Sequence, residues 1–157
     1  MIRKNVGLVC FFLVLSIVFT GCKKEVGLEG LYPVKGKITL DGAPLEGASI
    51  TLSPSFTGEN ARTAGALSDA SGAFSIQTLT DNDGAFPGEY LISVSKMVPD
   101  KVYTDAEYEA ANAKGESLKV NAQNVLPAKY AKHQTSELKV TVVAGKNEAL
   151  IINLEKK

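Results

Sequence analysis

The sequence predicts an all-β protein, a seven-strand antiparallel β-sandwich with one short helical insertion. Short runs of alternating apolar and polar residues are the first indication, because a period of two puts one strand face in a core and the other in solvent. Turn-forming stretches such as Asp41-Gly42 and Ser71-Gly72 separate these runs. Seven such runs need two layers to bury their apolar faces. The predicted strands are 34–40, 48–52, 62–68, 73–78, 89–96, 138–142 and 150–154.

Length and composition fit one globular domain. The chain has 157 residues, of which 45% are hydrophobic and 22% charged. Removing Arg3 and Lys4 with a predicted signal segment changes 17 basic and 17 acidic residues to 15 and 17. This balance argues against nucleic acid as a partner, because such binding needs a basic excess. The two cysteines, Cys10 and Cys22, leave the predicted sandwich without a thiol for a disulfide or a cysteine metal site.

The amino terminus, residues 1–21, is predicted to be a secretory signal peptide. Arg3 and Lys4 precede an uncharged apolar run of 15 residues, 6–20. As a helix this run measures about 22 Å, short of the ~30 Å hydrocarbon core of a bilayer. A cleaved signal therefore fits better than a permanent membrane span.

The end of this run, Phe19-Thr20-Gly21-Cys22, resembles the lipobox of bacterial lipoproteins. The resemblance implies that the Cys22 thiol takes a diacylglycerol, that the chain is then cleaved between Gly21 and Cys22, and that Cys22 carries fatty acyl chains such as palmitate. Residues 22–31 are then a lipidated tether to the membrane, since two or three acyl chains anchor a protein stably. The expected location is the bacterial cell envelope, on the periplasmic face or the cell surface.

Three turns join neighbouring strands and predict three antiparallel hairpins. The first joins 34–40 to 48–52, the second joins 62–68 to 73–78, and the third joins 138–142 to 150–154. In the fifth strand Tyr90, Ile92 and Val94 are expected to share the buried face.

An insertion at 98–130 interrupts the strand pattern. Thr104 and Glu107 have the spacing of a capping box, and Gly115 closes an alanine-rich stretch of about ten residues. A helix is predicted here, lying on the sandwich surface because it has little apolar area of its own. The chain is then expected to return through 126–130 in extended form.

Three motifs together resemble the carboxypeptidase regulatory-like domain, a transthyretin-like (prealbumin-like) sandwich with an Ig-like Greek key. They are VKGKITLDGAPLEGASITL, LSDASGAFSI and PGEYLISV. The matching residues are Asp41, Gly42, Pro44, Leu45, Gly47, Ala48, Asp69, Gly72, Phe74, Gly88 and Tyr90. The resemblance covers 34–154 and implies a non-catalytic module. Physics gives these residues structural roles: glycines and Pro44 fix turns, while Phe74 and Tyr90 fill the core.

Candidate chemistry is sparse. His133 lies in a polar loop without a cysteine partner, so we expect neither a metal site nor a general base there. The stretch 81–84 has an acidic, calcium-like look, but EF-hand spacing would need ligands at Leu79 and Tyr90. A turn rich in Asp and Asn is the favoured interpretation, with a looser calcium site including Glu89 left open. We expect no enzyme activity, no cofactor and no metal.

Three tyrosines in or beside the insertion, Tyr103, Tyr108 and Tyr130, are the candidate ligand platform. Exposed in one plane they would stack sugars, whereas buried they would pin the insertion to the sandwich. The sequence therefore predicts a non-enzymatic, lipid-anchored binding or scaffold module of the envelope. A carbohydrate-binding module using 98–130 is the alternative. The expected partners are the membrane and an envelope protein or polysaccharide.

Overall fold

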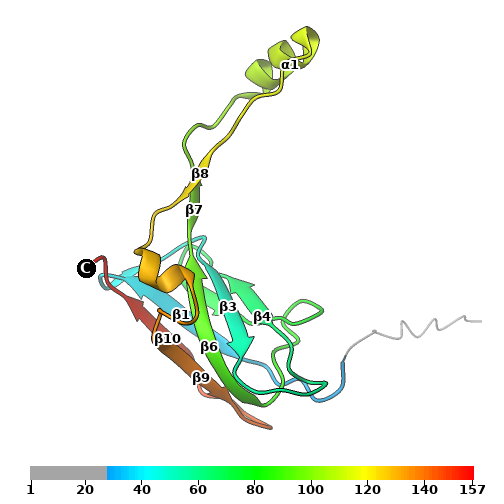
Figure 1. Cartoon of the computed structure of the whole chain (residues 1–157), viewed down its shortest axis with the longest axis vertical. Coiled ribbons are helices and arrows are strands. Elements are labelled where there is room, and N and C mark those ends of the chain that lie inside the picture. Colours follow the sequence, from blue (N-terminus) through cyan, green and yellow to red (C-terminus); the bar gives the residue numbers. More distant parts are fainter. Residues whose placement is uncertain (1–27) are drawn as a thin grey trace, which may run out of the picture.

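The computed structural model describes residues 28–157 as a two-layer β-sandwich from which one long arm projects (Figure 1). Sheet 1 contains β10 (Leu150–Leu154), β1 (Lys35–Leu40) and β2 (Ala43–Pro44), with β5 (Ala73–Ser75) also pairing with β1. Sheet 2 has the order β4 (Ala64–Leu67), β3 (Ser49–Pro54), β6 (Gly88–Ser95) and β9 (Leu138–Val142). The predicted all-β sandwich with one helix is confirmed.

The arm contains the remaining regular elements. A two-stranded ribbon, β7 (Met97–Pro99) and β8 (Ala122–Asn124), supports the helix α1 (Asp105–Lys114) at its end. The chain then returns to the sandwich through a 3-10 turn, η1 (Ala128–Ala131), where an extended segment was predicted. No helix of residues 28–157 is long and apolar enough to cross a membrane.

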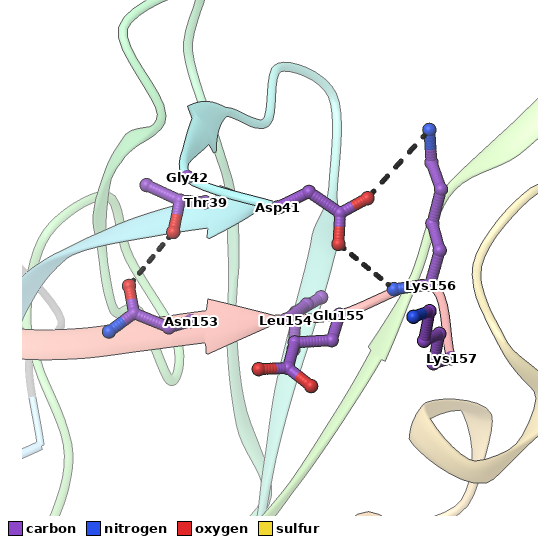
Figure 2. Close-up of a pocket in the computed structure, with 8 residues that line it drawn as sticks. All are labelled: Thr39, Asp41, Gly42, Asn153, Leu154, Glu155, Lys156 and Lys157. Carbon is purple, nitrogen blue, oxygen red and sulfur yellow. Dashed lines mark hydrogen bonds and ion pairs between the residues drawn. The ribbon is translucent and has the colours of Figure 1, made fainter.

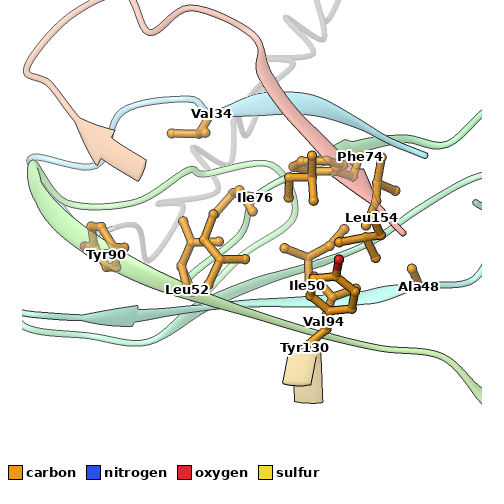
Figure 3. Packing of buried hydrophobic residues seen from close by; sticks show 14 of the residues in the cluster. Val34, Ala48, Ile50, Leu52, Phe74, Ile76, Tyr90, Val94, Tyr130 and Leu154 are labelled. Atoms are coloured by element: carbon orange, nitrogen blue, oxygen red, sulfur yellow. The ribbon is translucent and has the colours of Figure 1, made fainter. Parts of the chain in front are cut away.

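The core lies between the two sheets, where side chains from both meet (Figure 3). In β6, Tyr90, Ile92 and Val94 are buried, as the alternation predicted. They face the buried side chains of sheet 1, which include Ile38, Phe74, Ile152 and Leu154.

Two of the three predicted hairpins are wrong in their pairing, and the second forms only in part. β1 and β3 lie in opposite sheets, and so do β9 and β10. β4 and β5 are assigned to different sheets, but the predicted second hairpin pairs at Gly65 with Gln77, and the Asp69 N–H donates to the Ala73 carbonyl oxygen at 2.9 Å. The reason is that alternation identifies the buried face of a strand but not its hydrogen-bonding neighbour. Two strands around a turn bury the same faces whether they pair or arch across the core.

The sandwich is also not antiparallel throughout, because β1 and β10 pair in parallel from Gly36–Leu150 to Leu40–Leu154. Gly36 permits this close approach. A Cβ built on Gly36 would collide with the Leu150 carbonyl oxygen and the Phe74 ring. Sheet 1 therefore joins the first and the last long strand of the sandwich, β1 and β10, side by side.

The two ends of the sandwich are distinct. Tyr32 bridges to Ala85, shortly before β6 begins at Gly88. The arm begins immediately after β6 ends at Ser95. Since eight residues of strand span about 26 Å, the entry of the chain and the base of the arm lie at opposite ends of the sandwich.

Candidate functional site

The arm, residues 97–125, is the part of the structure that the sandwich does not require. Its helix stands beyond the ribbon, away from both sheets (Figure 1), where a position on the sandwich surface was predicted. Ala111 is the one buried residue among 97–125, and the rest are exposed or half-buried. The arm therefore has no hydrophobic core of its own.

Side-chain amides hold the base of the arm. The Asn124 Oδ1 atom accepts hydrogen bonds from the backbone N–H of Lys96 at 3.0 Å and of Leu126 at 3.2 Å. Further out, the Asp100 carboxylate accepts two hydrogen bonds from Asn121, one from its backbone N–H and one from its side-chain amide, both at 3.0 Å. The Asn121 side-chain amide, followed by its backbone N–H, lowers the pKa of Asp100.

The helix at the tip forms as the capping residues predicted. The Glu107 backbone N–H donates to the Thr104 Oγ1 atom at 3.3 Å, and the Thr104 N–H donates to the Glu107 carboxylate at 2.7 Å. Gly115 ends the helix in the left-handed conformation, with φ of 69°. The Thr104 N–H, followed by the Thr104 hydroxyl and Lys101, lowers the pKa of Glu107. The tip is thus locally ordered by its own sequence.

Exposed apolar side chains gather on the arm. Val102 is 81% exposed and Met97 is 56% exposed, although both are apolar. Four further large apolar or aromatic side chains of the arm are exposed: Val98, Tyr108, Val120 and Val125. Concentrated apolar exposure of this kind marks interaction surfaces in soluble domains.

Two of the three predicted platform tyrosines lie together on the arm. The Tyr103 and Tyr108 ring centroids are 5.8 Å apart, and the ring planes meet at 66°. The Lys101 Nζ atom lies 4.1 Å from the centroid of the Tyr103 ring and 3.3 Å from a Glu107 carboxylate oxygen. One face of Tyr103 is therefore occupied, and the two rings are not coplanar.

Tyr130 does not join this pair. It belongs to η1, is 6% exposed and packs into the core of the sandwich (Figure 3). Its hydroxyl accepts a hydrogen bond from the Glu155 backbone N–H at 3.1 Å. A platform of Tyr103, Tyr108 and Tyr130 is therefore not formed, because the third ring anchors the returning chain.

The acidic turn at 81–84 is occupied by its own backbone. The Asp83 carboxylate accepts hydrogen bonds from the N–H groups of Thr78, Leu79 and Thr80 at 2.6 to 2.9 Å. Burial raises the pKa of Asp83, but these N–H groups outweigh it and the pKa is lowered. His133 lies half-buried in a turn. Within residues 28–157, no three His, Cys, Asp or Glu side chains come together as metal ligands.

An open pocket of about 760 Å³ lies where the last strand passes the turn after β1 (Figure 2). Its polar groups are largely paired with one another. The Thr39 hydroxyl donates to the Asn153 Oδ1 atom at 2.8 Å, and Asp41 accepts from the Lys156 backbone N–H at 3.2 Å. The Lys156 ammonium is 4.0 Å from the Asp41 carboxylate. These contacts hold the end of the last strand against the turn after β1.

The ribbon is the part of the arm that sequence reasoning missed. Its strands have three residues each and carry Pro99 and two amide side chains, so no alternation is visible. The one local indication of the ribbon is the pair Asp100 and Asn121. Asp100 lies two positions after the middle residue of β7, and Asn121 lies two positions before the middle residue of β8. Gly21 and Cys22, the predicted cleavage and lipidation residues, lie outside the described residues.

Comparisons with known proteins assign no activity. Residues 34–99 match the model of a family described as a domain of unknown function (DUF6795). The matched segment runs from the start of the sandwich to the last residue of β7. No curated protein matches the chain, and no solved structure matches it.

Proposed function

We propose that this protein is a non-enzymatic, lipid-anchored binding module of the bacterial cell envelope, and that its arm binds a protein partner. The observation that carries the proposal is the arm itself, which exposes six large apolar side chains and buries one alanine. A projecting segment without a core gains little stability from its own packing. Burial of these side chains against a partner supplies the apolar contact that the monomer lacks.

The positions of the two chain regions support anchoring at one end and binding at the other. The predicted lipidation residue, Cys22, precedes Tyr32 by ten residues, and the bridge from Tyr32 to Ala85 places Tyr32 beside the start of β6, at the end opposite the arm. Ten residues of extended chain reach about 33 Å at most. The tether therefore holds the sandwich near the membrane while the arm remains free to meet a partner.

The proposed absence of catalysis is supported by the roles that polar groups have in the structure. Asp83 and Asp100 accept backbone N–H groups, and Ser136 donates to the Ile92 carbonyl oxygen from a buried position. These are structural hydrogen bonds that close turns and hold strands. An enzyme needs such groups aimed at a substrate instead.

A carbohydrate-binding module is the alternative, and the adjacent rings of Tyr103 and Tyr108 are the feature that favours it. Sugars stack on flat exposed aromatic faces, however, and these rings meet at 66° with Lys101 over one of them. The other exposed large apolar side chains of the arm, Met97, Val98, Val102, Val120 and Val125, are all aliphatic, a surface that suits a polypeptide better than a sugar. The geometry therefore favours a protein partner.

Site-specific photo-cross-linking in cells tests the proposal with the full chain. A photoreactive residue at Val102, on the arm, should give a discrete protein adduct. The same residue at Ile151, which is 59% exposed on the sandwich, is the matched control. Adducts at both positions or at neither would contradict a binding site on the arm.

The lipid anchor and the sugar alternative need separate measurements. Metabolic labelling with an alkyne fatty acid should mark the wild-type chain and fail with Cys22→Ser; persistent labelling of that variant would contradict the anchor. Retention of the full chain by isolated envelope polysaccharide, lost in a Tyr103→Ala/Tyr108→Ala variant, would instead establish the carbohydrate-binding alternative.

A further inference from the structure

We propose that two copies of this chain pair through the outer edge of β8, joining two ribbons into one four-stranded antiparallel sheet. The inference rests on the proposal that the arm is the binding surface, and it names a second copy as the partner. It follows from the direction of the backbone groups in the ribbon and from the distribution of charge along the molecule.

Hydrogen bonds show which backbone groups of the ribbon point outward. The Asp100 N–H donates to the Asn121 carbonyl oxygen at 2.8 Å, and the Val125 N–H donates to the Lys96 carbonyl oxygen at 3.0 Å. In an antiparallel ladder, hydrogen-bonded and non-hydrogen-bonded pairs alternate. The intervening pairs, Met97 with Asn124 and Pro99 with Ala122, therefore direct their backbone groups away from the ribbon. Within residues 28–157, no third strand pairs with either edge.

The outer edge of β7 and the outer edge of β8 differ in their outward-pointing N–H groups. On the outer edge of β7, Pro99 has no N–H to donate, and proline at such a position blocks strand addition. On the outer edge of β8, Ala122 and Asn124 both present an N–H and a carbonyl oxygen. The β8 edge is thus the one that accepts another strand, and its ligand is an extended polypeptide.

The charge distribution indicates a second copy as the source of that strand. The tip, residues 104–116, carries four acidic side chains and Lys114. The acidic residues are Asp105, Glu107, Glu109 and Glu116. The base of the arm meets η1 and the end of the chain, which the bond from the Glu155 N–H to Tyr130 holds together. This region has a basic excess, with Lys129, Lys132, Lys156 and Lys157 against Glu155 and against Asp41, which lies 4.0 Å from the Lys156 ammonium.

Antiparallel pairing places the acidic tip of one copy beside the basic region of the other. About a two-fold axis at Ala122, residue 116 of one copy is level with residue 128 of the other, because each lies six positions from Ala122. The acidic tip of each copy then faces the basic region of the other. Opposite charges of this kind select the register and orientation of a complex.

The side chains along β8 are compatible with self-pairing. About the same axis Asn121 of one copy lies opposite Gln123 of the other, and this amide pair occurs twice. Each amide both donates and accepts, so the pairs are self-complementary. Lys119 lies opposite Val125, so this pair brings no like charges together. An isolated two-stranded ribbon is only marginally stable, whereas the resulting sheet has four strands.

Disulfide trapping of the full chain tests the pairing directly. Ala122→Cys places two thiols at the axis, where hydrogen-bonded antiparallel partners have Cα atoms about 5.5 Å apart, within disulfide range. Met97→Cys, on the blocked edge, is the matched control, and the wild-type chain gives the background from Cys10 and Cys22. Membranes carrying each chain are treated with a mild oxidant and resolved without reductant. We expect a reducible dimer for Ala122→Cys alone; no dimer, or equal dimer from Met97→Cys, would overturn the inference.

Light scattering separates this inference from the proposed function. The full chain in detergent is measured at about 100 μM, because interfaces of this small size are weak. The wild type should show twice the monomer mass, and Ala122→Pro should be monomeric with an unchanged near-ultraviolet spectrum, since its lost N–H points outward. A monomeric wild type would overturn the pairing. An adduct between Val102 and a different protein would keep the proposed function and also overturn self-pairing.

Discussion

Asp100 and Asn121 face each other across the arm, and together they close the ladder that begins at β7 and β8. The Asp100 N–H donates to the Asn121 carbonyl oxygen, while the Asp100 carboxylate takes both the backbone N–H and the side-chain amide of Asn121. Asp100 directly follows β7, and Asn121 directly precedes β8. It extends the ribbon toward the helix without adding any apolar burial.

Asp100→Ala should loosen the outer ribbon while leaving the sandwich intact. The Asn121 amide loses its carboxylate acceptor, so we expect several-fold faster hydrogen exchange at that amide. Amides of β6, which belong to the sandwich, should keep their protection. Equal acceleration in β6 and at Asn121 would contradict a local role for this pair.

The same pair should respond to acid. The pKa of Asp100 is lowered by Asn121, so the folded arm holds the ionised form more strongly than the unfolded chain. Its contribution is therefore fully present above the unfolded pKa of about 3.9 and is lost as the pH falls through the lower folded value. Exchange at the Asn121 amide, corrected for its intrinsic pH dependence, should rise below about pH 4. In Asp100→Ala, this extra rise should disappear.

Thr104→Ala should destabilise the helix at the tip without changing the thermal unfolding of the sandwich. Loss of the N-cap hydroxyl costs about 1 kcal/mol in helix stability, and α1 projects away from the sheets. Circular dichroism should show reduced helical signal at an unchanged melting temperature of the β-structure. Thr104→Ser, which keeps the hydroxyl, is the control and should behave as the wild type.

The sequence predicted the buried faces of this fold but not its strand partners. Tyr90, Ile92 and Val94 are buried as their alternation requires, and Thr104 with Gly115 bounds the helix. A turn between two amphipathic strands is compatible with a hairpin and with an arch between sheets. Which one forms depends on contacts between distant residues, such as the parallel pairing of β1 with β10.

The candidate site was predictable in part for the same reason. Tyr103 and Tyr108 are five positions apart, one on each side of the helix N-cap Thr104, so local sequence could place them together. Tyr130 lies only 22 positions beyond Tyr108, yet it packs into the sandwich core and bonds to the Glu155 N–H, contacts with residues distant in the sequence. The ribbon depends on three-residue strands stabilised by Asn124 and Asp100 side chains, a pattern without periodicity.

Gly36→Ala tests the closure of sheet 1. An added methyl group would meet the Leu150 carbonyl oxygen and the Phe74 ring, so β1 and β10 must separate. Overpacking of this kind costs about 1–3 kcal/mol, measurable by urea unfolding. Gly65→Ala is the control within a strand, because its nearest neighbour, the Ile50 carbonyl oxygen, is 3.3 Å from the added carbon. An equal loss in both variants would contradict a special role for Gly36.

Tyr90 combines core packing with one buried hydrogen bond, and Tyr90→Phe isolates the bond. The Tyr90 hydroxyl donates to the Phe86 carbonyl oxygen at 3.0 Å, and the residue is fully buried. Removing the hydroxyl leaves that carbonyl without its donor, so unfolding in urea should need about 1–2 kcal/mol less free energy. Burial also raises the pKa of Tyr90, so its contribution persists below the unfolded pKa of about 10 and fades as the pH rises through the folded value. Tyr108→Phe, on the exposed arm, should leave the free energy of unfolding unchanged, and a loss equal to that of Tyr90→Phe would contradict the assignment.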